Sequence, residues 1–191
     1  MKSTLSQNDI YFLQKAIALA QENVLSGNGG PFAAIITKND EIIAYGTNVV
    51  TTQNDPTAHA EVSAIREACK TLNSFQLDSC TLYSSCEPCP MCLGAIYWAR
   101  LQRLVFAADK RQAEEAGFDD AFIYKELELL YPQRKLDTMQ IRLPEENKPF
   151  QLWKDSVTKK TILVFFYLQK NSNFSSVRGN PKLARLLFAI M

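Results

Sequence analysis

The first part of the chain has the hydrophobic spacing of an amphipathic helix. From Ile10 to Val24, apolar residues recur at intervals of three and four, which places them on one helical face. Ser6 and Asp9 stand before this pattern in the arrangement of a capping box, and Gly27 follows its end. The pattern predicts a helix that covers one face of a sheet with its apolar side.

Short apolar runs after this helix predict strands. Residues 32–36 and 42–45 are joined by a polar turn and predict an antiparallel hairpin. Two later runs, residues 81–84 and 104–108, are separated by a helical stretch, and a strand–helix–strand connection places its two strands in parallel. These pairings together predict an α/β fold with helices on the faces of the sheet.

The second half of the chain alternates between helical and extended patterns. Residues 110–130 have a helical pattern that is interrupted at Gly117. Every second residue of 139–143 is apolar, which predicts a last strand, and residues 150–157 carry one apolar helical stripe. We therefore assign residues 1–161 to one folded domain.

Residues 162–191 differ from this domain in composition and form an atypical C-terminal tail. They contain four basic residues and no acidic one, and they begin with the apolar, β-prone run 162–168. Such a run aggregates when it is exposed, so we expect it to extend a sheet edge or to pack at a subunit interface. The polar stretch that follows is expected to stay mobile.

The charge of the chain gives little support to a nucleic-acid partner. The net charge is +1, but because the tail holds four of the 21 basic residues, residues 1–161 carry 17 basic against 20 acidic residues. A domain with a charge of −3 lacks the basic face that a phosphate backbone requires.

The cysteines and the apolar runs indicate a soluble, cytoplasmic protein. Three of the five cysteines, Cys86, Cys89 and Cys92, lie too close in sequence for a secreted disulfide framework. The N-terminus lacks the apolar core of a signal peptide, and the run 162–168 is too short to span a bilayer. A reducing compartment without a membrane anchor is therefore expected.

Metal-binding residues are concentrated between residues 59 and 92. His59, the only histidine, is followed by Glu61, and Cys89 and Cys92 stand in a Pro-Cys-x-x-Cys sequence. Three ligands and a carboxylate that need not bind metal are the inventory of a catalytic zinc site, which keeps one position open for water. A core histidine with two buried thiols is the alternative. Cys86 would close the site as a fourth ligand, so we assign it to packing.

Both halves of this inventory stand where a helix is predicted to begin. Pro56 precedes an apolar helical pattern that has His59 and Glu61 in its first turn, and Pro90 occupies the first helical position after Cys89. The positive end of a helix lowers the pKa of a nearby thiol, which favours the thiolate that zinc binds. Two helix N-termini are therefore predicted to converge on one metal ion.

These motifs resemble the zinc-dependent nucleobase and nucleoside deaminases of the cytidine deaminase-like superfamily. Within that superfamily, residues 54–61, 86–99 and 115–120 resemble bacterial guanine deaminases, and the resemblance runs from about residue 10 to about residue 160. It implies a three-layer α/β/α fold with a mixed central sheet. It also implies one zinc ion per subunit, held by His59, Cys89 and Cys92.

The resemblance assigns further roles to single residues. Glu61 would shuttle protons between the zinc-activated water, the ring nitrogen and the departing amine, and Asp120 would assist ammonia release. Asn48, Phe32, Ala60 and Trp98 are the implied substrate contacts: an amide that hydrogen-bonds the purine, two aromatic walls and a backbone N–H. As alternatives, Asn48, Phe32 and Trp98 suit ordinary loop or core positions, and Asp120 suits a helix N-cap.

The reaction implied is hydrolysis of guanine to xanthine and ammonia, in purine catabolism or salvage. The resemblance also implies a homodimer in which the C-terminal segments are exchanged and help to close the active sites. This chain departs from the family at its end, where Ile162 takes the place of a terminal aromatic residue. A tRNA adenosine deaminase and a non-catalytic, zinc-stapled module are the two other functions that the motifs permit.

Overall fold

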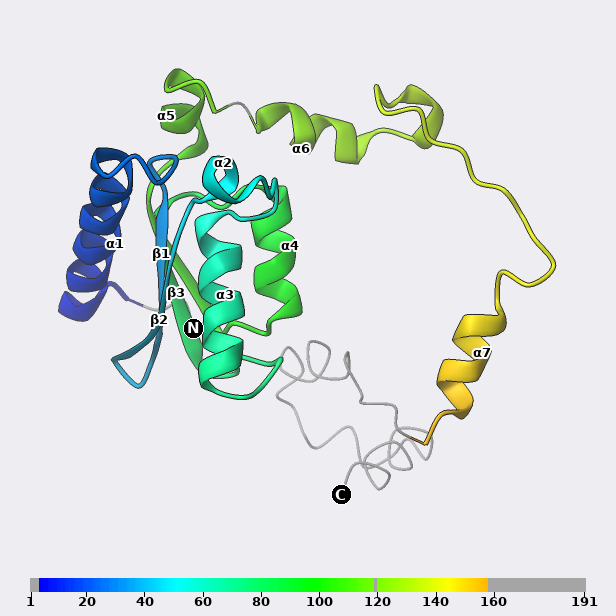
Figure 1. Ribbon diagram of the computed structural model, residues 1–191, viewed down its shortest axis with the longest axis horizontal. Coiled ribbons are helices and arrows are strands. Elements are labelled where there is room, and N and C mark those ends of the chain that lie inside the picture. Colours follow the sequence, from blue (N-terminus) through cyan, green and yellow to red (C-terminus); the bar gives the residue numbers. More distant parts are fainter. Residues whose placement is uncertain (1–3, 119, 158–191) are drawn as a thin grey trace. The chain divides into compact units, whose positions relative to one another are not determined.

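The computed structural model describes residues 4–118 and 120–157. The chain divides into two compact units, residues 1–138 and 139–191 (Figure 1). The predicted tail, 162–191, and the predicted domain boundary at residue 161 lie outside the described residues.

A four-stranded mixed sheet forms the centre of the first unit, with the order β2-β1-β3-β4. β1 pairs with β2 and with β3 in antiparallel fashion, and β3 pairs with β4 in parallel. The predicted hairpin and the predicted parallel pair are both confirmed. The strands are β1 (Ala33–Lys38), β2 (Glu41–Thr47), β3 (Cys80–Cys86) and β4 (Arg103–Ala108).

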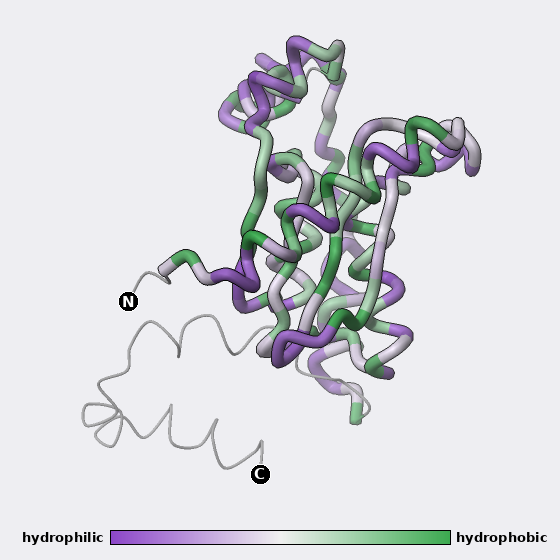
Figure 2. The backbone as a smooth tube through the Cα atoms, turned by 90° about the vertical axis from the view of Figure 1, so that its left-hand side faces the viewer, coloured by the Kyte–Doolittle hydropathy of each residue, from purple (hydrophilic) through white to green (hydrophobic). Residues whose placement is uncertain are grey.

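Helices cover both faces of the sheet and complete the predicted three-layer fold. α1 (Gln7–Leu25) lies on one face, whereas α3 (Ala60–Thr71) and α4 (Pro90–Trp98) lie on the other (Figure 1). Alternate residues of β1 supply the two cores: Ile35 packs with the α1 side, and Ile36 packs with the side of α3 and α4. Hydrophobic and hydrophilic residues are interspersed along α1, which lies on the side facing the viewer in Figure 2.

A buried polar network attaches the start of α1 to the sheet. Ser6 and Asp9 form the predicted capping box. The fully buried carboxylate of Asp9 also accepts a hydrogen bond of 2.9 Å from the Tyr83 hydroxyl and pairs with both terminal nitrogens of Arg103. These bonds, that of Arg103 above all, hold the pKa of Asp9 well below its usual range. One carboxylate thus joins α1, β3 and β4.

The helical pattern after β4 forms three short helices. The predicted break is confirmed at Gly117, whose φ of +91° suits glycine and ends α5. The sequence did not predict one further short helix, α2 (Val50–Gln53), which precedes α3. The three helices after β4 are α5 (Lys110–Glu115), α6 (Ala121–Glu128) and the 3-10 helix η1 (Tyr131–Gln133).

The described part of the second unit corrects one prediction. It contains α7 (Lys148–Asp155), but residues 139–143 form no strand there, so the predicted last strand is wrong. Alternation makes one face of a segment apolar, yet a strand forms only where a neighbouring strand satisfies its backbone groups. None of the helices in residues 4–118 and 120–157 combines the length and the apolar composition needed to cross a membrane.

Candidate active site

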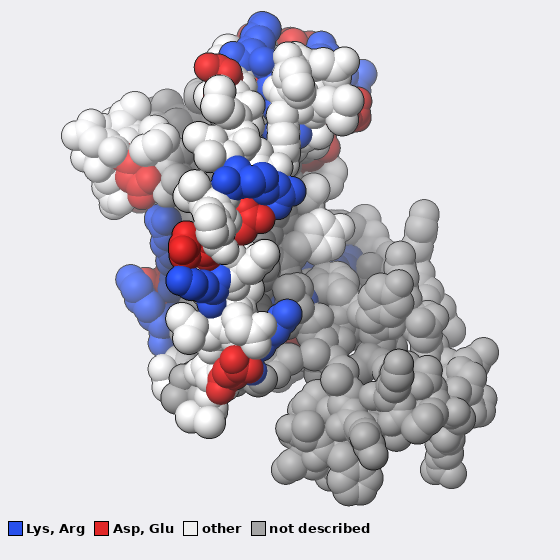
Figure 3. Space-filling view, turned by 90° about the vertical axis from the view of Figure 1, so that its right-hand side faces the viewer, with Lys and Arg blue, Asp and Glu red and all other residues white. Residues whose placement is uncertain are grey.

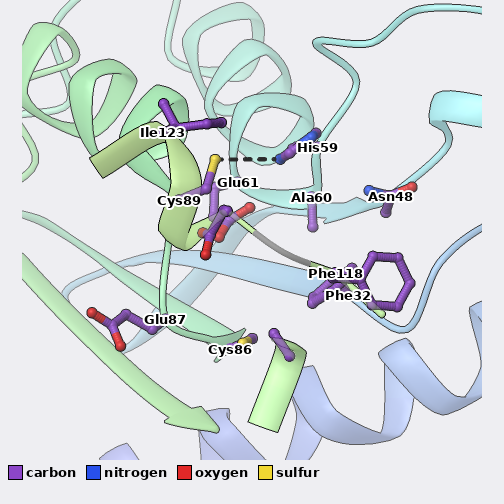
Figure 4. Close-up of a pocket in the computed structure, with 12 residues that line it drawn as sticks. Phe32, Asn48, His59, Ala60, Glu61, Cys86, Glu87, Cys89, Phe118 and Ile123 are labelled. Atoms are coloured by element: carbon purple, nitrogen blue, oxygen red, sulfur yellow. Dashed lines mark hydrogen bonds between the residues drawn. The ribbon is translucent and has the colours of Figure 1, made fainter. Parts of the chain in front are cut away.

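The N-termini of α3 and α4 meet at one point of the first unit. His59 is the N-cap of α3 and Cys89 is the N-cap of α4, each with the extended backbone that a helix entrance requires. Pro90 takes the first helical position, where its missing N–H costs nothing. The side chains of His59 and Cys89 point towards each other (Figure 4). Local sequence signals therefore bring these two residues to positive helix ends.

The three predicted metal ligands are close enough to share one ion. Their ligand atoms lie within 4.8 Å of one another, and His59 Nδ1 is 3.6 Å from Cys89 Sγ and 3.5 Å from Cys92 Sγ. A tetrahedral zinc ion with bonds of about 2.3 Å to sulfur and about 2.0 Å to nitrogen holds such ligands about 3.5 Å apart. The residues present therefore fit zinc with three protein ligands.

The two cysteines share a hydrogen bond that distinguishes their protonation. That bond lowers the pKa of Cys89 and raises the pKa of Cys92, because it favours one thiolate over two. His59 also lowers the pKa of Cys89. A divalent cation at this point would remove the penalty for the second thiolate, since it attracts both.

Glu61 lies beside the predicted metal ligands, in a buried position where its carboxylate is hydrogen-bonded. Its carboxylate accepts hydrogen bonds from Ser84 Oγ at 3.2 Å and from Cys92 Sγ at 3.3 Å. The residue is only 6% exposed, and burial raises its pKa. A buried carboxyl group beside the metal ligands has the position of a group that exchanges protons with a reacting molecule.

A cavity of about 260 Å³ opens beside these groups. Polar groups and apolar or aromatic side chains are interspersed in its wall, the composition of a small-molecule site: Ile123 lies near Cys89, and Asn48 lies on the side of Phe32 and Phe118 (Figure 4). The lining residues are Phe32, Asn48, His59, Ala60, Glu61, Cys86, Glu87, Cys89, Ala113, Phe118, Asp120 and Ile123.

Asn48 and Phe32 are held in the cavity wall by several contacts. The Asn48 N–H donates to the Phe32 carbonyl at 3.0 Å, and the buried Asn23 amide donates to the Asn48 and Gly30 carbonyls at 2.9 and 2.8 Å. A Cβ on Gly29 would lie only 2.0 Å from the Asn48 carbonyl oxygen, so this approach requires glycine. The loop before β1 and the end of β2 are thereby joined.

Comparisons with known proteins place this geometry in a family. Residues 6–108 match the family model of the cytidine and deoxycytidylate deaminase zinc-binding region. The chain belongs to this family. It is a zinc-dependent deaminase, and zinc is its cofactor.

Individual relatives extend the similarity beyond that region. The guanine deaminase of Bacillus subtilis (strain 168) is 57% identical over 149 residues, which is 78% of this chain and 96% of that protein. An X-ray structure of guanine deaminase from Bacillus subtilis matches with a TM-score of 0.80 at 54% identity, covering 83% of this chain and 100% of that one. The tRNA-specific adenosine deaminase of Aquifex aeolicus (strain VF5) is 44% identical over 102 residues, 53% of this chain and 67% of that protein.

Most of the site residues predicted for the deaminase lie together. Phe32, Asn48, Ala60 and Asp120 line the same cavity as His59, Glu61 and Cys89, and the buried Cys92 completes the metal-binding group. Asp120 precedes the first residue of α6, and burial followed by the nearby charge of Cys89 raises its pKa. Cys86 lines the cavity, and the group of possible metal ligands found among the described residues is His59, Cys89 and Cys92. That Cys86 does not bind the metal stays a prediction.

Trp98 is the predicted substrate contact that the structure does not bring to the cavity of the deaminase. It is the last residue of α4 and is 61% exposed. At about 1.5 Å per residue, the helix places it about 12 Å along the axis from Pro90, which stands next to the metal-binding residues. Its position at the far end of α4 explains its absence from the lining.

Several lining residues were not predicted as site residues. Phe118 packs edge-to-face on Phe32, with ring centroids 4.8 Å apart and planes at 84°. Glu87, Ala113 and Ile123 also line the cavity. Phe118 and Glu87 lie in the stretches 115–120 and 86–99 that carry the family resemblance, so a sequence signal was available for both. Ala113 and Ile123 lie outside these stretches and have no such signal.

Proposed function

We propose that this deaminase hydrolyses free guanine to xanthine and ammonia in purine catabolism or salvage. The observation that carries the proposal is one cavity that joins a three-ligand zinc site, a buried carboxyl group and aromatic walls suited to a flat base. The similarity to a guanine deaminase over 96% of its length supports the choice of guanine.

His59, Cys89 and Cys92 would hold the zinc ion, as their distances allow. Bound zinc lowers the pKa of a water molecule to about 7, which supplies a nucleophile at neutral pH. Glu61, from its place beside this group, accepts the water proton and delivers it to the ring nitrogen next to the attacked carbon. Glu61 would then pass the second proton of that water, from the hydroxyl now on the carbon, to the amine; the carbon–nitrogen bond breaks and ammonia leaves, so that one water is consumed and one ammonia is released.

The base would lie against Phe32, whose ring is held in turn by Phe118. Asn48 offers an amide donor and acceptor to the purine edge. Ala60, as the first residue of α3, offers a backbone N–H that has no partner within its own helix. A few polar groups in a mostly apolar wall fix the orientation of a flat ligand.

Asp120 is assigned to the exocyclic amine of guanine. Its carboxyl group lines the cavity near Cys89, and burial raises its pKa, so it accepts and returns a proton more readily than an exposed aspartate. In this role it helps ammonia to leave. Trp98 has no assigned contact within one subunit.

We propose further that residues 1–161 form the deaminase domain of a cytoplasmic homodimer with exchanged C-terminal segments. Large apolar side chains support this assembly: Leu130 and Leu152 are each 72% exposed, and Phe150 is 67% exposed. Deletion of residues 171–191 is expected to leave guanine turnover within tenfold of the full chain. A larger loss from a folded dimer would contradict these domain limits.

A tRNA adenosine deaminase is the second candidate, because several such enzymes share 37% to 47% identity with part of this chain. The distribution of surface charge favours free guanine over tRNA as the substrate. On the described part of the face in Figure 3, basic and acidic side chains are interspersed rather than gathered by sign. A tRNA-binding surface requires clustered lysine and arginine.

One assay tests the proposal: ammonia release from guanine, adenine, cytosine, cytidine and an adenosine-containing tRNA anticodon stem-loop. The expected result is turnover of guanine at least 100-fold above each other substrate, and guanine turnover in a Glu61→Gln control about 10²- to 10⁴-fold below that of the wild type. Turnover of the stem-loop above guanine, with binding that weakens steeply as salt rises, would replace guanine deamination by tRNA editing.

A further inference from the structure

Ser84 is a buried polar residue with no role in the proposed chemistry, yet it contacts that chemistry directly. It lies within β3, is 1% exposed, and its hydroxyl is 3.2 Å from Glu61 Oε1. The hydroxyl therefore reaches across from the sheet to the helix that carries Glu61. A buried hydroxyl is retained only where it is hydrogen-bonded.

The direction of this hydrogen bond follows from a second one. The Cys86 N–H donates to Ser84 Oγ at 3.4 Å, so the oxygen acts as acceptor there. The hydroxyl hydrogen is then free to point at the carboxylate, which is the stronger acceptor. A chain of donors thus runs from the Cys86 amide through Ser84 to Glu61.

The backbone of Ser84 has little freedom to move. β3 is an inner strand, and Ser84 stands opposite Ala34 on β1 and Phe106 on β4. Strands paired on both sides hold a side chain more rigidly than a loop does. Ser84 therefore presents its hydroxyl from a fixed position.

The second oxygen of the Glu61 carboxylate accepts a hydrogen bond from Cys92, a residue that would lose its thiol proton on binding zinc. Glu61 Oε2 accepts from the Cys92 thiol at 3.3 Å. Cysteine binds zinc as the thiolate, which has no proton to donate. Ser84 keeps its proton in the zinc-loaded protein, so its bond to Glu61 persists when that of Cys92 is lost.

From this arrangement we propose that Ser84 is a positioning residue that holds the Glu61 carboxylate in the orientation required for proton transfer. The proposal rests on the proposed role of Glu61. Ser84 is not among the residues that line the cavity, and the hydrogen bonds of its hydroxyl are those with Glu61 and with the Cys86 N–H. Its loss should lower the rate of the chemical step and leave the binding of guanine and zinc intact.

The test compares Ser84→Val with Ser84→Thr, two side chains of the same shape that differ in the hydroxyl. Relative to Ser84→Thr, the valine variant is expected to lose about 10- to 100-fold in kcat, the usual effect of one hydrogen bond to a charged group, with KM within threefold. Zinc content, measured by metal analysis, should be the same in both.

Ser85→Val is the matched control for damage to β3. Ser85 is buried and accepts the Ala33 N–H at 3.0 Å, but it faces the opposite side of the sheet, so its loss costs stability without reaching Glu61. If Ser84→Val does not fold, Ser84→Ala is compared with the wild type instead. A kcat loss in Ser85→Val equal to that in Ser84→Val would overturn the proposal.

A double variant separates the proposed role of Ser84 from the proposed role of Glu61, on which it rests. If Ser84 acts through Glu61, Ser84→Val has no further effect on turnover in a Glu61→Gln background. If Ser84→Val and Ser84→Thr have equal kcat while Glu61→Gln loses turnover, the role of Ser84 is refuted and that of Glu61 stands. Full activity of Glu61→Gln would refute the assigned role of Glu61 itself.

Discussion

Replacement of Gly46 by alanine should lower the activity of the enzyme, although Gly46 lies in β2, a strand that carries no catalytic residue. Gly46 lies in β2 where the first turn of α3 crosses it, and a Cβ there would be 2.2 Å from the Ala60 carbonyl oxygen and 2.4 Å from the Ala64 nitrogen. Both atoms belong to the helix backbone, so no side-chain rotation relieves the clash. Non-bonded heavy atoms rest about 3.5 Å apart, so α3 must move by roughly 1 Å.

That displacement has two measurable costs. Overpacking of this kind costs about 1 to 3 kcal/mol of unfolding free energy, and the rigid neighbours here favour the upper value, about 3 kcal/mol. The helix also carries Glu61 and follows His59, and a misplacement of about 1 Å in a catalytic group lowers the rate roughly 100-fold. We expect Gly46→Ala to be destabilised and to turn over guanine about 100-fold more slowly.

Gly94→Ala is the matched control, because Gly94 lies in α4 and a Cβ there meets no atom within 4 Å. Alanine in a helix is about 1 kcal/mol more favourable than glycine, so this variant should be as stable as the wild type or more so. Urea unfolding, zinc content and guanine turnover are measured for both variants. Equal stability and turnover in Gly46→Ala and Gly94→Ala would show that the close approach of α3 to β2 does not constrain the site.

Three further predictions concern single carboxylates. Glu61→Gln should keep near-normal zinc content while turnover falls by about 10²- to 10⁴-fold, the usual effect of a positioned acid or base; zinc loss as large as that of Cys89→Ala would show that Glu61 is a ligand. Asp120→Asn should lose guanine turnover yet stay folded and zinc-loaded, and activity within threefold of the wild type would remove the argument for guanine. Asp9→Asn should be less stable at pH 7 by about 2 kcal/mol, since the variant loses a buried ion pair with the partly exposed Arg103. Because folding lowers the pKa of Asp9, the stability that the Asp9 carboxylate contributes is present above its unfolded pKa of about 4 and is lost as the pH falls towards the folded pKa. Urea unfolding of Asp9→Asn and the wild type at pH 7 and pH 3 should therefore show a smaller stability difference at pH 3. An equal difference at both pH values would contradict this pH dependence.

Local signals explain what could be predicted about the metal-binding residues. His59 and Cys89 occupy helix entrances, and a helix entrance is specified by the few residues around it, such as Pro90 in the first turn. The break at Gly117 was predictable for the same reason, because only local backbone geometry is involved. Resemblance then supplied roles for Glu61 and Asp120 that no spacing alone specifies.

Contacts between distant segments were decided only by the tertiary structure. The alternation in residues 139–143 predicted a strand, but the described chain has no pairing there, since a partner strand is not a property of the segment itself. The end of α4 holds Trp98 away from the cavity, whereas Phe118 reaches Phe32 across 86 residues of sequence. Ser84 has no motif to distinguish it from Ser85, and only the packing of α3 on β3 places its hydroxyl against Glu61. The sequence by itself determined which residues can hold zinc, because helix caps are local; the folded sheet decided which side chains surround that zinc, because they come from elements far apart in the chain.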